Sequence, residues 1–305
     1  MPLPLRSGVL AAGLAYVMWG VFPLYIKQLG NVPALEVVAH RSMWSFVLVV
    51  GLLAFLGRLG WLRDLMASPR TLLLFALSAA LLSANWLLYV WAVNAGRVLD
   101  ASLGYFINPL VNVLLGVLVL HERPRPLHWV AVGLAAAGVG WLALGTGHVP
   151  WVSLALALSF GLYGLLRKTA QLAALEGLAL ETWLQAPLAI GYLVWLAAHG
   201  QGHFGPSAPG LSGWLLLAGP FTAIPLLLFA HGARQVTMTT LGLMQYISPS
   251  LQFMLGLWLY HEPFDAQRGL GFLLIWTGLA LYTAESWRQR RAAVDAAAAA
   301  DATRA

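Results

Sequence analysis

Two apolar segments of this chain carry the same pattern of polar side chains, spaced i, i+3 and i+7 so that one face of a helix holds each set. The first set consists of Tyr105, Asn108 and Asn112. The second set, at an offset of 140 residues, consists of Gln245, Ser248 and Gln252. Amides and hydroxyls inside apolar segments are costly and bind through hydrogen bonds, so this chemistry indicates recognition of a ligand.

Each set also contains a proline near the middle of its segment. Pro109 follows Asn108, and Pro249 follows Ser248. A proline removes one backbone donor and frees a carbonyl of the preceding turn, which a neighbouring amide, hydroxyl or ligand satisfies. We therefore expect two paired helix breaks that line a substrate cavity at the middle of the membrane. The alternative is an ordinary kink whose polar neighbours bond to adjacent helices.

One basic residue, Arg41, lies well inside an apolar segment, about 10 Å from the segment's end at 1.5 Å per residue. A charge at that depth must pair, reach the interface or face water. Its forked guanidinium suits a carboxylate or phosphate of a substrate. A structural pairing with Glu36 is the alternative, and the sequence leaves both open.

Aromatic residues and one further amide complete the candidate site. Aromatics at helical spacing mostly pack or form interface belts, but several here lie away from the helix ends, where they suit the wall of a cavity for flat, partly apolar molecules. The whole set expected to bind substrate is Arg41, Asn85, Trp86, Tyr89, Tyr105, Asn108, Asn112, Tyr163, Gln245, Ser248 and Gln252.

The elements that must position these residues are membrane-spanning helices. The chain is 60% hydrophobic and 9% charged, whereas a soluble domain has roughly 25% charged residues. Ten apolar runs, each on the order of 20 residues, follow one another from about residue 8 to 287, and the seventh is expected over about Glu181–His199. The sequence therefore predicts an all-α polytopic membrane protein with ten transmembrane helices.

The distribution of positive charge predicts the orientation. With the N-terminus in the cytoplasm, 13 of the 17 Lys and Arg residues fall on the cytoplasmic side and 3 in outside loops. Both termini are then cytoplasmic. The net charge of +6 is explained without nucleic acid. The expected partners are the lipid bilayer and a small-molecule substrate, and the oligomeric state is left open.

The offset of 140 residues extends beyond the two polar sets. Asn108-Pro109, Gly116 and His121-Glu122 match Ser248-Pro249, Gly256 and His261-Glu262. Each half holds five spans, an odd number, so the second copy enters the membrane from the opposite side. We expect inverted repeats over residues 1–146 and 147–287 and a cytoplasmic Ala-rich tail over 288–305. Many secondary transporters build alternating access on such repeats; the alternative is a duplication without functional consequence.

Enzyme chemistry is not indicated. The sequence has no Walker loop, no HExxH and no Gly-x-Ser-x-Gly elbow, so we expect no catalytic residue, metal or cofactor. All eleven Asp and Glu residues are expected in loops, near helix ends or in the tail. Coupling through a central carboxylate is therefore not expected. Uniport, exchange, and proton coupling through His40 or a peripheral Glu are left open.

Five short strings resemble RarD-type permeases of the EamA family, in the drug/metabolite transporter superfamily. They lie at residues 19–27, 40–45, 85–88, 101–110 and 240–247. The chain departs from the family pattern at His121 and His261, where glycine is expected. The resemblance implies a permease of the bacterial inner (plasma) membrane that moves a small amphipathic or aromatic metabolite or drug, with no secure substrate. A non-transporting membrane scaffold or sensor subunit is the alternative function.

Overall fold

Every regular element in the described part of the chain is a helix. The computed structural model describes residues 3–30, 32–58, 60, 68–95, 97–144, 150–259 and 266–302. The helices are α1 (Leu3–Gln28), α2 (Ala34–Phe55), α4 (Pro69–Asn94), α5 (Val98–Leu118), α6 (Pro126–Leu144), α7 (Trp151–Thr169), α8 (Ala174–Ala198), α9 (Pro209–Ala233), α10 (Met238–Gln245), α11 (Ile247–Trp258) and α12 (Ala266–Ala302). Because α10 and α11 follow each other directly, the described chain forms ten rods.

The apolar composition of these helices matches an environment of lipid. Within the described residues, α1, α2, α4, α6 and α9 are long and apolar enough to cross a membrane, and Leu103–Leu118 and Gly269–Glu285 are shorter apolar stretches. Many large apolar side chains, such as Leu73 and Leu188, lie exposed on the outside of the bundle. Such a surface is stable in hydrocarbon, so the chain is a multi-pass membrane protein.

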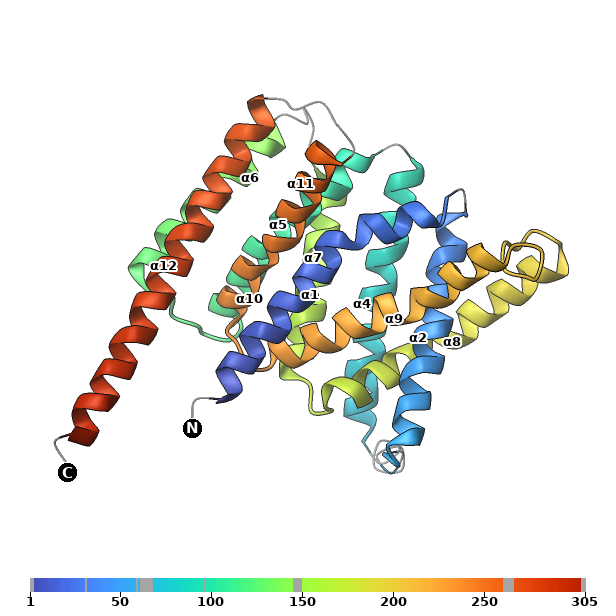
Figure 1. Cartoon of the computed structure of the whole chain (residues 1–305), viewed down its shortest axis with the longest axis horizontal. Coiled ribbons are helices and arrows are strands. Elements are labelled where there is room, and N and C mark those ends of the chain that lie inside the picture. The colour runs from blue at the N-terminus through green and yellow to red at the C-terminus, as the bar shows by residue number, and fades with distance from the viewer. Residues whose placement is uncertain are drawn as a thin grey trace.

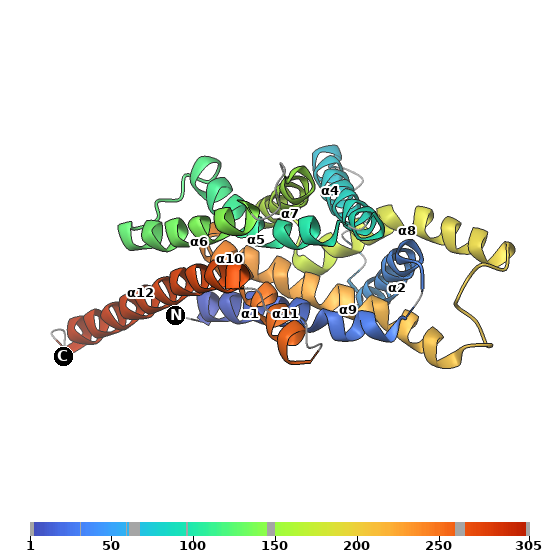
Figure 2. The ribbon, with the colours of Figure 1, turned by 90° about the horizontal axis from the view of Figure 1, so that it is seen from above.

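The helices lie in two layers with a pair at either end. In Figure 2, α4, α5, α6 and α7 lie in one layer, and α1, α9, α10, α11 and α12 lie in the other. The pair α6 and α12 closes one end of the bundle, and α2 and α8 pack together at the other end (Figure 1). Within the layers, α5 packs on α7, and α1 packs on α9 and α11; between the layers, α5 packs on α10. Aromatic rings fill the centre, where Tyr16, Trp19, Phe160 and Tyr163 surround the buried Phe229.

Two helix boundaries differ from the sequence-based expectation. The run expected to begin at Glu181 begins at Ala174, so that Glu181 is the eighth residue of α8. Glu176 and Glu181 looked like an end of the apolar run because hydropathy does not count the partners that neutralise a buried carboxylate. At the other boundary, α12 continues through Ala302, so the Ala-rich tail is helical to that residue and extends beyond the bundle (Figure 1). His261-Glu262 and residues 303–305 lie outside the described part.

The expected pair of helix breaks is not at the two prolines. Helix α5 is continuous through Pro109, since a proline removes one ladder bond while the turns on either side keep theirs. In the second half a break does occur, but it falls at Tyr246, between α10 and α11. Pro249 is the third residue of α11, within the first turn, where the missing N–H of proline costs nothing.

Candidate functional site

A row of one cation and three aromatic rings crosses α2, α4 and α5. The Arg41 guanidinium lies 3.6 Å from the ring centroid of Trp86. Trp86 contacts Tyr89 edge-to-face at 5.8 Å, and Tyr89 contacts Tyr105 in the same way at 5.9 Å. Arg41 and Tyr105 are each the eighth residue of their helices, which begin on the same side of the bundle (Figure 1). The row therefore lies at one depth, about 10 Å from those helix ends.

Arg41 is buried without a polar partner. Its side chain is 5% exposed, and its Nε has no hydrogen bond. No ion pair or hydrogen bond joins Arg41 to any other described residue. Glu36, the structural partner that the sequence left open, instead accepts hydrogen bonds from the backbone N–H and the Nδ1 of His203, and lies 3.8 Å from His40 Nε2. The Trp86 ring is consequently the main contact that offsets the charge of Arg41.

The amides of α5 and α10 form a second group, a hydrogen-bonded network at the crossing of these helices. Asn108 Nδ2 donates to the backbone oxygen of Ala157 on α7 at 2.6 Å. Asn112 Nδ2 donates to Asn108 Oδ1 at 3.1 Å and to Gln245 Oε1 at 3.0 Å. Asn108 and Asn112 are each 1% exposed. In this conformation the network ties helices together and leaves only Asn112 Oδ1 unpartnered.

The close approach of α5 and α10 depends on a glycine. A Cβ atom at Gly242 would lie 2.5 Å from the backbone oxygen of Pro109 and 3.0 Å from Asn112 Cβ. Only a glycine lets the backbones meet at that distance. A few residues along, the Tyr246 hydroxyl donates to the backbone oxygen of Phe106 at 3.2 Å, joining positions 140 residues apart. The amide network and this bond therefore lie on one compact crossing.

The remaining expected site residues contact α1 and α7. Asn85 Nδ2 donates to Leu156 O and to Ser159 Oγ, both at 2.9 Å. Gln252 Nε2 donates to Trp19 O at 3.0 Å and only weakly to Ser248 Oγ at 3.5 Å. Ten of the eleven expected residues thus divide between the row, the network and these contacts. The eleventh, Tyr163, packs on Phe160 and Phe229 in the aromatic centre, so the eleven do not form one cluster.

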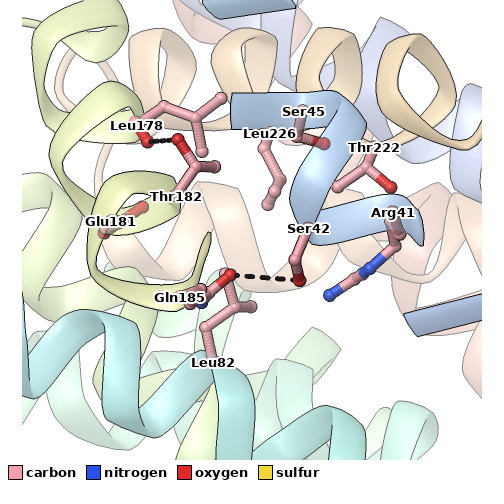
Figure 3. A pocket seen from close by; sticks show the side chains of 10 residues that line it. All are labelled: Arg41, Ser42, Ser45, Leu82, Leu178, Glu181, Thr182, Gln185, Thr222 and Leu226. Atoms are coloured by element: carbon pink, nitrogen blue, oxygen red, sulfur yellow. Dashed lines mark hydrogen bonds between the residues drawn. The ribbon is translucent and has the colours of Figure 1, made fainter. Parts of the chain in front are cut away.

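A small cavity lies beside the row, between α2, α8 and α9 (Figure 3). Its volume of about 10 Å³ is enough for one water-sized group. Its polar lining comes from Arg41, Ser42, Ser45, Glu181, Thr182, Gln185 and Thr222. In Figure 3 the nitrogen atoms of Arg41 extend toward the open centre, away from the ribbon of α2.

Glu181 corrects the expectation that every carboxylate lies in a loop, near a helix end or in the tail. It is fully buried, and its oxygens accept hydrogen bonds from Ser78 on α4 and, at 3.5 Å, from Tyr163 on α7. Arg167 Nη1 lies 3.6 Å from it and pairs with it electrostatically. The reason is the start of α8. The helix begins at Ala174, seven residues before Glu181, so Glu181 lies inside the helix among these groups and not at its end.

A signal in the sequence identifies Glu181. The tripeptide Ala34-Leu35-Glu36 returns as Ala174-Leu175-Glu176, at the offset of 140 residues already seen in the polar sets. The same offset carries Arg41 onto Glu181, and each is the eighth residue of its helix. Thr222 and Gln185 had no such signal, because serine, threonine and glutamine in apolar helices commonly satisfy themselves locally.

The described residues contain no group of three or more His, Cys, Asp or Glu side chains placed to hold a metal ion. The site therefore offers a guanidinium, aromatic faces, amides, hydroxyls and one buried carboxyl. Such groups recognise and hold a molecule through charge, stacking and hydrogen bonds.

Known proteins resemble this chain over nearly its full length. Residues 6–144 match the model of the EamA-like transporter family. The chain is 47% identical to the uncharacterized transporter YojE of Bacillus subtilis, over 94% of this chain and 97% of that protein. It is 41% identical to the protein RarD of Escherichia coli, over 94% and 97% of the two chains, and 35% identical to the chloramphenicol-sensitive protein RarD of Pseudomonas aeruginosa, over 93% and 96%. One crystal structure superposes with a TM-score of 0.69 at 18% identity, covering 93% of this chain and 99% of that chain, and therefore has the same fold.

Proposed function

The chain belongs to the RarD-type branch of the EamA-like transporter family, and from this premise we propose that it is a permease that moves a small amphipathic or aromatic molecule by alternating access. The relatives named as transporters place it among membrane transporters. What it carries, and how, is argued from the site.

The observation that carries the proposal is the row of Arg41, Trp86, Tyr89 and Tyr105. Three helices bring a cation and three rings to one depth, and Tyr105 keeps 36% of its surface exposed at the end of the row. Flat apolar surface with one charge is complementary to an aromatic molecule that bears a polar group. In the proposal the substrate lies against this row and next to the amide network of α5 and α10, with Asn85 and Tyr163 on the flanking helices.

Alternating access follows from an inverted repeat of residues 1–146 and 147–287. An exchange of the two halves turns the pair α1–α9 into the pair α7–α4, and the pair α1–α11 into the pair α7–α5. All four pairs are in contact. The pairs α2–α8, α5–α10 and α6–α12, which such an exchange leaves unchanged, are also in contact. The family model ends at residue 144, after five helices. This pattern supports two similar halves that rock about a shared centre.

The proposed location is the bacterial inner membrane, with both termini in the cytoplasm. The bias of 13 Lys and Arg residues against 3 supports this orientation. The relatives named above are all bacterial. In Figure 1, α1 begins and α12 ends on the same side of the bundle, as an even number of crossings requires.

Flux through reconstituted protein tests the proposal. The purified chain is reconstituted into proteoliposomes, which are loaded in turn with benzoate, tryptophan or chloramphenicol. Chloramphenicol is included because one relative's name refers to it. Counterflow of the radiolabelled compound is then measured, with empty liposomes as the control. We expect saturable counterflow of at least one of the three and its loss in Trp86→Ala. No flux of any of them by a folded protein would instead favour the non-transporting scaffold or sensor.

A further inference from the structure

Two donors in the cavity between α2, α8 and α9 lack an acceptor. The first is Arg41, which has neither an ion pair nor a hydrogen bond to any described residue. The second is the hydroxyl of Thr222 on α9, which is 7% exposed and also unpartnered. Both side chains line the same cavity (Figure 3). A buried guanidinium and a buried hydroxyl without acceptors are costly, and one anionic group placed between them would satisfy both.

The rest of the lining leaves that position open. Ser45 donates to Gly219 O at 3.2 Å, and Ser42 donates to Gln185 Oε1 at 3.4 Å, so these hydroxyls are already engaged. The volume of about 10 Å³ admits a single oxygen atom of a carboxylate, phosphate or sulfonate, but no ring. The remainder of such a molecule must lie along the aromatic row, which ends at the partly exposed Tyr105.

A carboxyl group lines the same cavity from the opposite helix. Glu181 on α8 lines the cavity together with Arg41 from α2, and its carboxyl group is faced by Arg167 and Tyr163 from α7 and by Ser78 from α4. When Glu181 is ionised, an anion at Arg41 meets a like charge in a medium of low dielectric constant. A proton on Glu181 removes that repulsion. Binding of the anion and binding of the proton therefore favour each other, and this coupling is reciprocal.

We propose that the chain binds an organic anion together with a proton, the anion at Arg41 and Thr222 and the proton on the Glu181 carboxyl. The proton comes from water on the side where the anion enters and returns to water where it leaves; no covalent bond of the substrate changes. This inference rests on the proposed transport function for its physiological meaning. Among the modes of coupling that the sequence left open, it selects proton coupling through a Glu side chain.

Binding to the full-length protein in detergent tests the anion site without any transport step. The probes are benzenesulfonate, which stays ionised at every relevant pH, and the neutral benzenesulfonamide. By calorimetry we expect the sulfonate to bind at least about tenfold tighter. Arg41→Gln should remove this preference. The nearly isosteric Thr222→Val should weaken sulfonate binding several-fold and leave the sulfonamide unchanged. Equal affinities in the wild type, or a preference that survives in Arg41→Gln, would overturn the proposal.

Proton uptake tests the role of Glu181. Titrations of benzenesulfonate in two buffers of different ionisation enthalpy should show uptake of up to about one proton per bound sulfonate, and affinity should fall by up to about tenfold per pH unit as pH rises. Glu181→Gln should still bind the sulfonate but lose both effects.

The matched control is Glu176→Gln, a buried carboxylate on the same helix that pairs with Arg58 outside the cavity. It should keep the proton uptake. Absence of proton uptake in the wild type, or persistence of uptake in Glu181→Gln, contradicts the proposal. If Glu181→Gln does not fold, the wild-type measurement alone decides. These experiments measure binding, and the liposome experiment measures flux. The anion–proton site can therefore be refuted while transport is observed, and transport can be refuted while binding is observed.

Discussion

Helices α5 and α10–α11 have the same polar pattern and the same proline, yet they are built differently. Helix α5 is one continuous rod, and its Asn108 and Asn112 are bonded within the protein at 2.6 to 3.1 Å. The second copy is interrupted at Tyr246, and Ser248 has only a contact of 3.5 Å with Gln252. Repeated sequence therefore does not give repeated mechanics. In the first copy the amides lie on one continuous helix, whereas in the second copy the helix is interrupted and Ser248 is the loosely held member beside the bonded Gln245 and Gln252.

The difference suggests a division of roles. A bonded α5 provides a fixed wall, while α10–α11 can change its angle near Tyr246, because Pro249 has no N–H to donate to the carbonyl of Gln245 and the helical ladder lacks that bond. Matched variants in the two copies test this division of roles.

The largest effect is expected from Asn108→Leu. The substitution removes the bond to Ala157 O and the acceptor of Asn112, leaving buried amide groups unpaired at about 1–3 kcal/mol. We expect counterflow in proteoliposomes to be abolished while membrane insertion persists. The matched change in the second copy, Ser248→Ala, should retain most of the flux. Normal flux in Asn108→Leu would show that the network has no part in transport.

Gly242→Ala should have the next largest effect. Its Cβ would overlap the backbone oxygen of Pro109 at 2.5 Å and push α10 from α5, at a cost of about 1–3 kcal/mol. A thermal unfolding measurement in detergent should show a lower Tm. Gly133→Ala on α6 is the control, because nothing lies within 4 Å of its added Cβ. The crossing is not tightly packed if both variants unfold alike.

The two prolines should differ in their effect on stability. Pro109 is in the interior of α5, where proline is about 3 kcal/mol less favourable than alanine, so Pro109→Ala should raise the Tm. Pro249 lies in the first turn of α11, where proline is tolerated, and Pro249→Ala should change the Tm little. If the larger rise appears in Pro249→Ala, the proline of the second copy is the strained one.

The smallest effect is expected at the start of α10. The Glu122 carboxylate accepts hydrogen bonds from the backbone N–H groups of Met238 and Thr239 at 2.6 and 3.1 Å, and from the Thr239 hydroxyl at 2.9 Å. Glu122→Gln should cost about 1 kcal/mol, as the loss of a charged helix cap does. Hydrogen exchange at the first turn of α10 should become faster while α5 stays protected; faster exchange in both would mean that the two helices open as one unit.

The sequence predicted the helices well, because lipid demands long apolar runs whose backbone bonds close internally. It also predicted the family from short strings such as residues 101–110. The exact position of the interruption at Tyr246 was beyond its reach: Pro249 frees a carbonyl of the preceding turn, but the sequence does not place the break three residues before the proline. What distinguishes Tyr246 is a hydrogen bond to Phe106, 140 residues away.

In the candidate site, too, the sequence predicted some features and not others. Spacing gave Asn108 and Asn112 one helix face, and the structure joins them by a hydrogen bond. Spacing gave no information about which helix lies next to Arg41, and thus none about its contact with Trp86 instead of Glu36. Partners across helices are chosen by packing, which a single sequence does not reveal.

The positions of Arg41 and Glu181 have a consequence for the origin of such a molecule. Two identical halves facing each other would bring together either two guanidinium groups or two carboxylates, and like charges in hydrocarbon repel strongly. A cavity of opposite charges requires halves that differ. In the proposed inverted repeat, one chain supplies two different halves in equal number and fixed orientation, so the centre of the molecule can be electrically asymmetric.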